Sequence, residues 1–295
     1  MAADSNPTPG VIDALIEAGA DVDEQGLGGM TALMIACEWG VEPGVALALL
    51  KGGADVNIRG DEGITAIGGA VLKNPDVELL RALIDAGAVL DARSKTGGTL
   101  LMRAAMANPN PEIVKELIAR GADVHAVETE EGMGALVMAA RFNPEPGVVE
   151  ALIAGGADVN GQMKDGTTAI MSAAAFNPNV EVVRVLIESG AEVDARAKDQ
   201  RTALFFAASQ SEYPDVVGLL VDAGADANAR FKGGWTALIA AAMWSPEPGM
   251  ISALLDAGAD AKAQTDQGYI ALDYLKKNDN LRESEAFLVL EEASR

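Results

Sequence analysis

The chain has 295 residues, a formal net charge of −22 at pH 7, a single cysteine and only 4% aromatic residues. A negative charge of this size argues against a nucleic-acid backbone or an anionic membrane surface as the main partner. One cysteine cannot form an intrachain disulfide, and no apolar run approaches the roughly 20 residues that a membrane-spanning helix needs.

A Gly-Ala pair recurs along the whole chain at an interval of 34 residues, with one interval of 35. A fixed period between about 20 and 50 residues is typical of a stacked-repeat array, in which each repeat contacts only its neighbours. The pattern therefore moves the search for function from a catalytic pocket to a surface. The glycines of these pairs are Gly19, Gly53, Gly87, Gly121, Gly156, Gly190, Gly224 and Gly258.

The first 30 residues contain only part of a repeat. Residues 2–9 align with residues 104–111, which comprise the end of one helix and the linker that follows it in a later repeat. We therefore expect the chain to start within a helix, with upstream sequence missing. A lone second helix is expected at about residues 9–18.

The repeat that begins at Thr99 illustrates the predicted layout. Residues 99–107 form a short first helix with small alanines on its inner face, and residues 108–111 form a linker. A second helix with one apolar stripe then runs to Gly121, which ends it in a left-handed conformation. The polar residues 122–133 have the length of a hairpin-like turn, here called a finger.

The linkers contain all twelve prolines of the chain, and none falls in a helix body or a finger. Within the linker of the Thr99 repeat, Asn110 is predicted to cap the second helix. Pro111 suits the first helical position, because an N–H group has no helical partner there. The prolines thus support the division into helices independently of the glycines.

First helices are predicted to begin at residues 31, 65, 99, 134, 168, 202, 236 and 270, which gives eight helix pairs. The predicted fold is an all-α repeat solenoid that forms a single domain over residues 1–295. It consists of a partial N-terminal repeat (1–30), seven full repeats (31–269) and a C-terminal cap (270–295). The cap ends in a Glu-rich helix around residues 287–292.

The openings of several repeats resemble the Thr-Pro-Leu-His-x-Ala opening of the ankyrin repeat: Thr31-Ala32-Leu33-Met34, Thr168-Ala169-Ile170-Met171 and Thr202-Ala203-Leu204-Phe205. The Gly-Ala-Asp-Val-Asn phrase and a glycine two residues before the threonine complete the likeness, which covers essentially the whole chain. It implies an ankyrin-like stack of about eight helix-turn-helix repeats with hairpin-like fingers. The family histidine is replaced by apolar residues such as Met34, so we expect apolar contacts in its place.

Catalytic and metal-binding constellations are not expected. The only histidine, His125, and the only cysteine, Cys37, lie 88 positions apart in the sequence, and two such side chains cannot form a closed zinc site. Cys37 replaces an inner-face alanine and is predicted to be a small buried residue. The repeated aspartates, such as Asp55 and Asp158, are expected to bind turn backbone. No cofactor and no metal are therefore predicted, and the chain is not expected to be an enzyme.

The resemblance places partner binding on a concave face made of fingers and first helices. Large aromatic residues gather there at two variable positions, one just before the repeat threonine and one eight residues after it. Basic residues gather in the fingers over residues 164–232. The predicted partner-binding residues are Trp39, Arg141, Phe142, Lys164, Phe176, Arg196, Lys198, Arg201, Phe206, Arg230, Lys232, Trp235, Trp244 and Tyr269.

The predicted function is therefore a non-catalytic scaffold for protein–protein interaction. The expected partner is another protein with an acidic or polar rim and an apolar centre, bound by a monomer, without nucleic acid and without membrane insertion. Two alternatives remain at this point: a regulatory or targeting module of a larger protein, and a repeat protein that binds a small ligand or a peptide.

Overall fold

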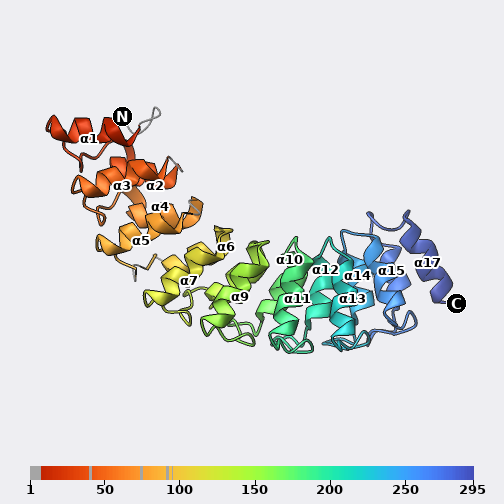
Figure 1. Cartoon of the computed structure of the whole chain (residues 1–295). Helices are drawn as coiled ribbons and strands as arrows, with labels where there is room; N and C mark the ends of the chain where they lie inside the picture. The colour runs from red at the N-terminus through yellow and green to blue at the C-terminus, as the bar shows by residue number, and fades with distance from the viewer. Residues whose placement is uncertain (1–7, 40–41, 74–75, 91–92, 95) are drawn as a thin grey trace. The chain divides into compact units, whose positions relative to one another are not determined.

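The computed structural model describes residues 8–39, 42–73, 76–90, 93–94 and 96–295 (Figure 1). The predicted partial helix at the start of the chain lies in residues 1–7, outside these ranges. By its internal contacts the chain divides into two compact units, Met1–Glu128 (unit 1) and Thr129–Arg295 (unit 2). The single domain over residues 1–295 stays a prediction.

Unit 1 contains seven α-helices in its described residues. The second helix α1 (Pro9–Glu17) comes first and is followed by three pairs of a first and a second helix. Short 3-10 turns, η2 (Leu27–Gly29) and η3 (Asp61–Gly63), lie in its first two fingers. The pairs are α2 (Ala32–Glu38) with α3 (Pro43–Lys51), α4 (Ala66–Lys73) with α5 (Val77–Asp85), and α6 (Leu100–Ala107) with α7 (Pro111–Ala119).

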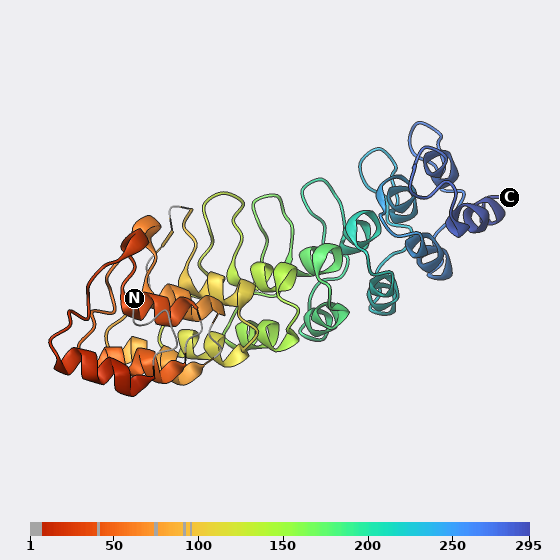
Figure 2. The same cartoon turned by 90° about the horizontal axis from the view of Figure 1, so that it is seen from above.

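Unit 2 contains five further pairs, and its fingers leave the helices on the same side (Figure 2). Within each unit, first helices pack on the next first helix, and second helices on the next second helix. The prediction of an all-α stack with eight pairs and a lone second helix is thus confirmed. The pairs are α8 (Ala135–Phe142) with α9 (Pro146–Ala154), α10 (Ala169–Phe176) with α11 (Val180–Glu188), α12 (Ala203–Gln210) with α13 (Asp215–Asp222), α14 (Ala237–Trp244) with α15 (Gly249–Asp256), and α16 (Ala271–Leu275) with α17 (Glu285–Ala293).

Each of the first eight second helices ends at its predicted glycine. Gly121, for example, has φ +94°, and its N–H donates to the Ile118 carbonyl at 2.9 Å. The next residue, Ala122, donates to the Leu117 carbonyl at 3.0 Å. This pair of bonds is the Schellman motif, which satisfies carbonyls that the helix itself leaves free.

The inner faces of the first helices are small and apolar. Ala104 and Ala105 are fully buried, and Met34 and Met102, which occupy the family's histidine position, are 1% exposed. Apolar contacts therefore replace the expected polar one. Cys37 is also fully buried, as predicted, and burial raises the pKa of its thiol to about 12.

Side-chain amides join successive repeats at two levels. In the linkers, the Nδ2 atom of buried Asn177 donates to the carbonyls of Ala140 at 2.8 Å and Asn143 at 2.9 Å. In the fingers, the Nδ2 atom of Asn160 donates to the Gly190 carbonyl at 3.1 Å. The repeated aspartates bind turn backbone as predicted, since Asp158 accepts the N–H of Asn160 at 3.0 Å.

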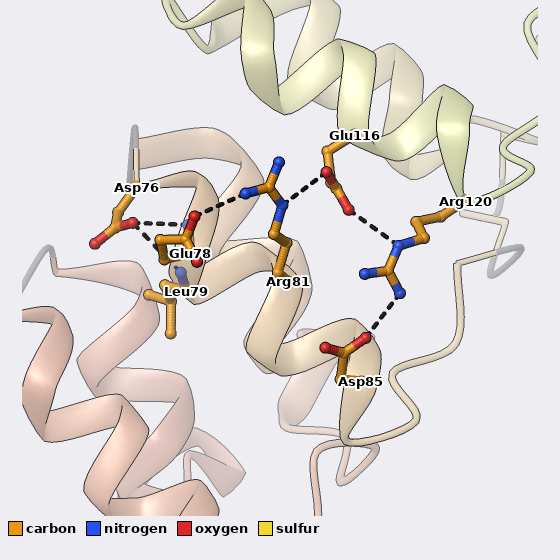
Figure 3. Close-up of polar contacts among 7 residues, drawn as sticks. All are labelled: Asp76, Glu78, Leu79, Arg81, Asp85, Glu116 and Arg120. Atoms are coloured by element: carbon orange, nitrogen blue, oxygen red, sulfur yellow. Dashed lines mark hydrogen bonds and ion pairs between the residues drawn. The ribbon is translucent and has the colours of Figure 1, made fainter.

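An ion-pair network joins the second helices α5 and α7 on the outside of unit 1 (Figure 3). Glu116 accepts from the Nε atoms of Arg81 at 2.9 Å and Arg120 at 3.0 Å. Arg81 also reaches Glu78 at 2.7 Å, and Arg120 reaches Asp85 at 2.8 Å. The hydrogen bond to Glu116 is the main cause that raises the pKa of Arg81, and the bond to Asp85 does the same for Arg120. These charged side chains of α5 and α7 are therefore engaged in contacts between two repeats.

Candidate functional site

The first helices and fingers of unit 2 carry three groups of aromatic and cationic side chains. In the first group, the guanidinium of Arg141 on α8 lies 5.2 Å from the Phe142 ring centroid and 4.2 Å from that of Phe176 on α10. Both rings are exposed. Because the cation lies between rings of adjacent repeats, it holds two apolar surfaces side by side.

The second group lies at the junction of a finger and α12. The guanidinium of Arg201 is 4.5 Å from the Phe206 ring centroid and 5.7 Å from that of Phe205. Arg201 also pairs with Asp199 in the same finger. Phe206 is buried. Its ring therefore packs against the Arg201 guanidinium but adds little exposed apolar area to the group.

The third group joins α14 and α16. The indoles of Trp235 and Trp244 are stacked, with centroids 4.7 Å apart and an interplanar angle of 11°. Tyr274 lies 4.9 Å from Trp235 and 6.0 Å from Tyr269, and the Lys277 Nζ atom lies 5.5 Å from the Tyr269 ring. Trp244 remains 49% exposed despite the stacking. A rigid, half-exposed pair of indoles is the kind of anchor that interfaces use.

These groups together are here called the aromatic surface, since all of its members lie on first helices of unit 2 or within two residues of their ends. Phe205 and Trp244 connect the second and third groups, with ring centroids 6.3 Å apart. The aromatic surface consists of Arg141, Phe142, Phe176, Arg201, Phe205, Phe206, Trp235, Trp244, Tyr269, Tyr274 and Lys277.

The basic residues of the fingers are exposed, but three of them bind the next or the preceding finger. Lys164 donates from Nζ to the Thr129 carbonyl at 2.6 Å. Arg196 donates to the Arg230 carbonyl at 3.1 Å, and Arg230 donates to the Gln264 carbonyl at 2.7 Å. These side chains keep their charge at the fingers while they fix the spacing of neighbouring fingers. Lys198 and Lys232 are also exposed.

Trp39 does not belong to this group of residues. It lies in unit 1, at the C-terminal end of α2, and is 62% exposed. It lines a groove with α1 and the first finger. The single set of residues predicted from the sequence therefore separates into an aromatic surface with basic fingers in unit 2 and one tryptophan in unit 1.

The sequence prediction missed Phe205, Tyr274 and Lys277. Two of these follow from positions within the repeat: Tyr274 has the position of Phe206, and Lys277 has the position of Arg141. Comparison of those positions across repeats is the signal that would have found them. The sequence places Phe205 only at the position of the family histidine, where an inward-facing side chain is expected. Phe205 is indeed 5% exposed, but its ring also contacts Trp244.

Within the described ranges, no group of three or more His, Cys, Asp or Glu side chains is arranged to hold a metal ion. The N–H of His125 donates to Asp123 in its own finger turn at 2.9 Å. None of the helices in those ranges has the length and apolar character needed to cross a membrane.

Comparison with known proteins supports the repeat assignment. A search of curated proteins found no match. The family model described as ankyrin repeats (3 copies) matches residues 1–95, 42–128, 68–162, 101–196, 136–231 and 192–265 in overlapping windows. These windows extend over most of the chain and agree with the helix pairs, the glycine-ended second helices and the fingers. The chain therefore belongs to the ankyrin-repeat family.

Proposed function

We propose that this chain is a non-catalytic scaffold that binds a partner protein on the aromatic surface and basic fingers of unit 2. Ankyrin repeats generally mediate protein–protein interactions and are typically non-catalytic. The single observation that carries the location is the stacked pair Trp235–Trp244, whose second ring stays 49% exposed. Tryptophan in a well-packed setting is among the residues most often found as an energetic anchor of interfaces.

The chemistry of the surface describes the partner. Exposed rings of Phe142, Phe176 and Trp244 offer an apolar centre, and the fingers add positive charge through residues such as Lys198 and Lys232. A partner with an apolar patch inside an acidic or polar rim complements both features. Because the cations lie over the rings at several points, the apolar centre is pre-arranged before the partner binds, which lowers the entropic cost of binding.

The test is affinity capture from a lysate of the source cell with three baits: the wild type, Trp235→Ala/Trp244→Ala, and Trp39→Ala. The captured protein is then purified and its affinity for each bait is measured by calorimetry. We expect the wild type and the Trp39→Ala control to bind alike and the double variant to bind at least about tenfold more weakly. Thermal unfolding of each bait checks that the stack is intact. An intact double variant with wild-type affinity would refute the location.

A further inference from the structure

Arg141 is the only charged residue in four consecutive first helices of unit 2, namely α8, α10, α12 and α14. The other residues of these helices are small, apolar or aromatic, apart from two serines and a glutamine. The side chain of Arg141 is half-buried among them. Because apolar groups replace part of the water around its guanidinium, the charge acts on a nearby anion more strongly than it would in bulk solvent.

The guanidinium of Arg141 has two aromatic neighbours but no ion-pair partner among the described residues. It lies 4.2 Å from the ring centroid of Phe176 and 5.2 Å from that of Phe142. A guanidinium has five N–H donors. No residue that the structure describes accepts a hydrogen bond from those of Arg141. The two rings therefore hold the cation in place and leave its donors available.

Arg201 shows how a second arginine of the aromatic surface is completed by a carboxylate. Its guanidinium lies 4.5 Å from the ring centroid of Phe206. Its Nε atom also donates to the carboxylate of Asp199 in the same finger. Arg141 has the aromatic neighbours but lacks an equivalent carboxylate in the described part of the chain. A carboxylate of another molecule can therefore take the place at Arg141 that Asp199 has at Arg201.

The rings beside Arg141 are accessible, whereas the ring beneath Arg201 is not. Phe142 is 49% exposed and Phe176 is 41% exposed, but Phe206 is buried. An anion that reaches Arg141 therefore brings its neighbouring groups against two exposed rings from adjacent repeats. A ligand with apolar groups beside its carboxylate covers these rings and gains from their burial, and a bare anion does not.

We propose that Arg141 binds a carboxylate of the partner protein, from an Asp or Glu side chain that apolar residues flank in the partner's sequence. The planar guanidinium donates two N–H groups to the carboxylate, which is the paired geometry that arginine favours. The flanking apolar side chains cover Phe142 and Phe176. This inference rests on the proposed function and names its acidic contact: Arg141 fixes the partner at one point, whereas Lys198 and Lys232 attract it over a longer range.

The test uses three short peptides with blocked ends, since blocking removes the terminal charges. The first has the sequence Gly-Leu-Glu-Phe-Gly. The second has Gln in place of Glu, and the third has Gly in place of both Leu and Phe. Each is titrated into the full chain labelled with ¹⁵N at arginine. Nuclear magnetic resonance then follows the Nε–H signal of Arg141, which is identified by its loss in Arg141→Lys.

We expect the first peptide to shift the Arg141 Nε–H signal in a saturable way. The second and third peptides are each expected to bind at least about tenfold more weakly, because one lacks the charge-assisted hydrogen bonds and the other lacks the apolar contacts. The Nε–H signal of Arg201 is the internal reference. It should not shift, because Asp199 already accepts this hydrogen.

Two variants separate a specific contact from a general loss of positive charge, with the backbone amide signals of α8 and α10 as the measure of binding. Arg141→Gln is expected to bind the first peptide at least about tenfold more weakly than the wild type does. Arg184→Gln makes the same change of charge at an exposed position of α11 in the same unit. It is the matched control and should bind as the wild type does. Thermal melts check that both variants are folded.

Three outcomes would overturn the proposal: no shift of the Arg141 signal with the first peptide, equal binding of the Gln peptide, or wild-type affinity in a folded Arg141→Gln variant. The Trp235→Ala/Trp244→Ala experiment is separate, because that variant keeps Arg141 and both of its rings. Failure of the peptide test alone leaves the partner at the tryptophans and removes only its acidic contact. Failure of the tryptophan test alone refutes that location and leaves the carboxylate contact at Arg141.

Discussion

Gln200 adopts a backbone conformation that the other repeats reserve for glycine. Its φ is +73°, the only positive φ at a non-glycine residue among the residues described. The equivalent finger positions in the neighbouring repeats are Gly166 (φ +84°) and Gly234 (φ +74°). A side chain in this left-handed region brings Cβ close to the backbone and costs about 1 kcal/mol or more. The strain lies one residue before Arg201, in the finger that supports the second group of the aromatic surface.

Gln200→Gly is expected to raise the free energy of unfolding by about 1 kcal/mol, because glycine tolerates this φ without strain. The matched control is Gly268→Gln at the equivalent finger position of the last repeat. Its φ is +83° and a Cβ there would meet no atom within 4 Å, so it adds backbone strain without a clash and should lower stability by a similar amount. Urea unfolding measures both. A Gln200→Gly variant less stable than the wild type would contradict the interpretation.

Because Cys37 is buried as a neutral thiol, the free energy of unfolding of unit 1 is expected to decrease at alkaline pH. Its pKa is about 12 in the folded chain against 9.0 for an ordinary thiol, so between these values the unfolded chain loses the proton and the folded chain keeps it. The stabilisation that comes from the buried, protonated thiol is fully present below pH 9. As pH rises toward 12 it is lost, and the free energy of unfolding falls by up to about 1.4 kcal/mol per pH unit.

Cys37→Ala is the control for this dependence, because alanine occupies the same position in later repeats, as Ala105 does. We expect the wild type to lose stability faster than the variant in urea unfolding above pH 9. Native Cys37 should also react slowly with a thiol reagent and rapidly in urea, because the reagent needs an accessible thiolate. Parallel pH profiles for the two proteins would show that the thiol is not protected by burial.

At the scale of the helix pair, the linkers hold successive repeats together through buried asparagines. Asn108 donates to the Val71 carbonyl at 3.0 Å, and Asn278 donates to the Ala242 carbonyl at 3.2 Å, just as Asn177 does to Ala140. The sequence predicted that Asn110 caps the second helix, because the cap and the helix are adjacent in the chain. The structure confirms this cap, since Asn110 accepts the Glu112 N–H at 3.0 Å. It did not predict the role of Asn108, since the partner carbonyl is 37 residues away.

Asn177→Ala is expected to lower the free energy of unfolding by about 2–3 kcal/mol, because it leaves two carbonyls of the preceding repeat and one N–H of its own linker without their partner. Asn177→Ser is the graded comparison. Serine occupies this position naturally at Ser211, where its hydroxyl accepts only the local N–H of Tyr213 at 3.1 Å. We expect Asn177→Ser to lose roughly half as much in urea unfolding. If the alanine variant were as stable as the wild type, the linker amides would not hold the repeats together.

At the scale of the whole molecule, the chain has 44 acidic and 22 basic residues, so negative charge dominates its electrostatics. Ion pairs such as Arg81–Glu116 and Arg120–Asp85 are local and use few of these charges. The remaining carboxylates repel one another, and such self-repulsion disfavours a compact state. Exposed pairs contribute little to stability on their own, so the repulsion is the larger of the two effects.

The thermal unfolding midpoint is therefore expected to rise as sodium chloride increases from about 20 mM to about 0.5 M, because salt screens exposed charges. Glu150→Lys/Glu188→Lys changes two exposed second-helix positions and should raise the midpoint at low salt while weakening its salt dependence. Differential scanning calorimetry measures both. A midpoint that falls with salt would show that attractive pairs outweigh the net repulsion.

The sequence predicted the fold well because its signals are local and recur in each repeat. Gly121 and its counterparts end the second helices, and the prolines mark the linkers. The aromatic surface was only partly predictable, because it depends on which neighbours a ring meets. Trp235 and Trp244 were found from two variable positions of the repeat, but nothing in those positions indicates that the rings stack at 4.7 Å or that Tyr274 from the next repeat lies against Trp235. Likewise, the sequence predicted that the basic finger residues form a binding rim, but it did not predict that Arg196 donates a hydrogen bond to the next finger.

The reach of the finger amides has a consequence for how such a chain can change length. Asn228 donates to the Gly258 carbonyl at 3.0 Å and accepts the Asp260 N–H at 2.7 Å, so each of its partners lies about one repeat further along the chain. An internal duplication of 34 residues supplies its own donors and acceptors at both new junctions and leaves the older ones unchanged. A duplication of any other length disturbs the bonds that span its junctions, because the donors and acceptors there no longer lie one repeat apart. The array can therefore grow or shrink by whole repeats without losing these bonds.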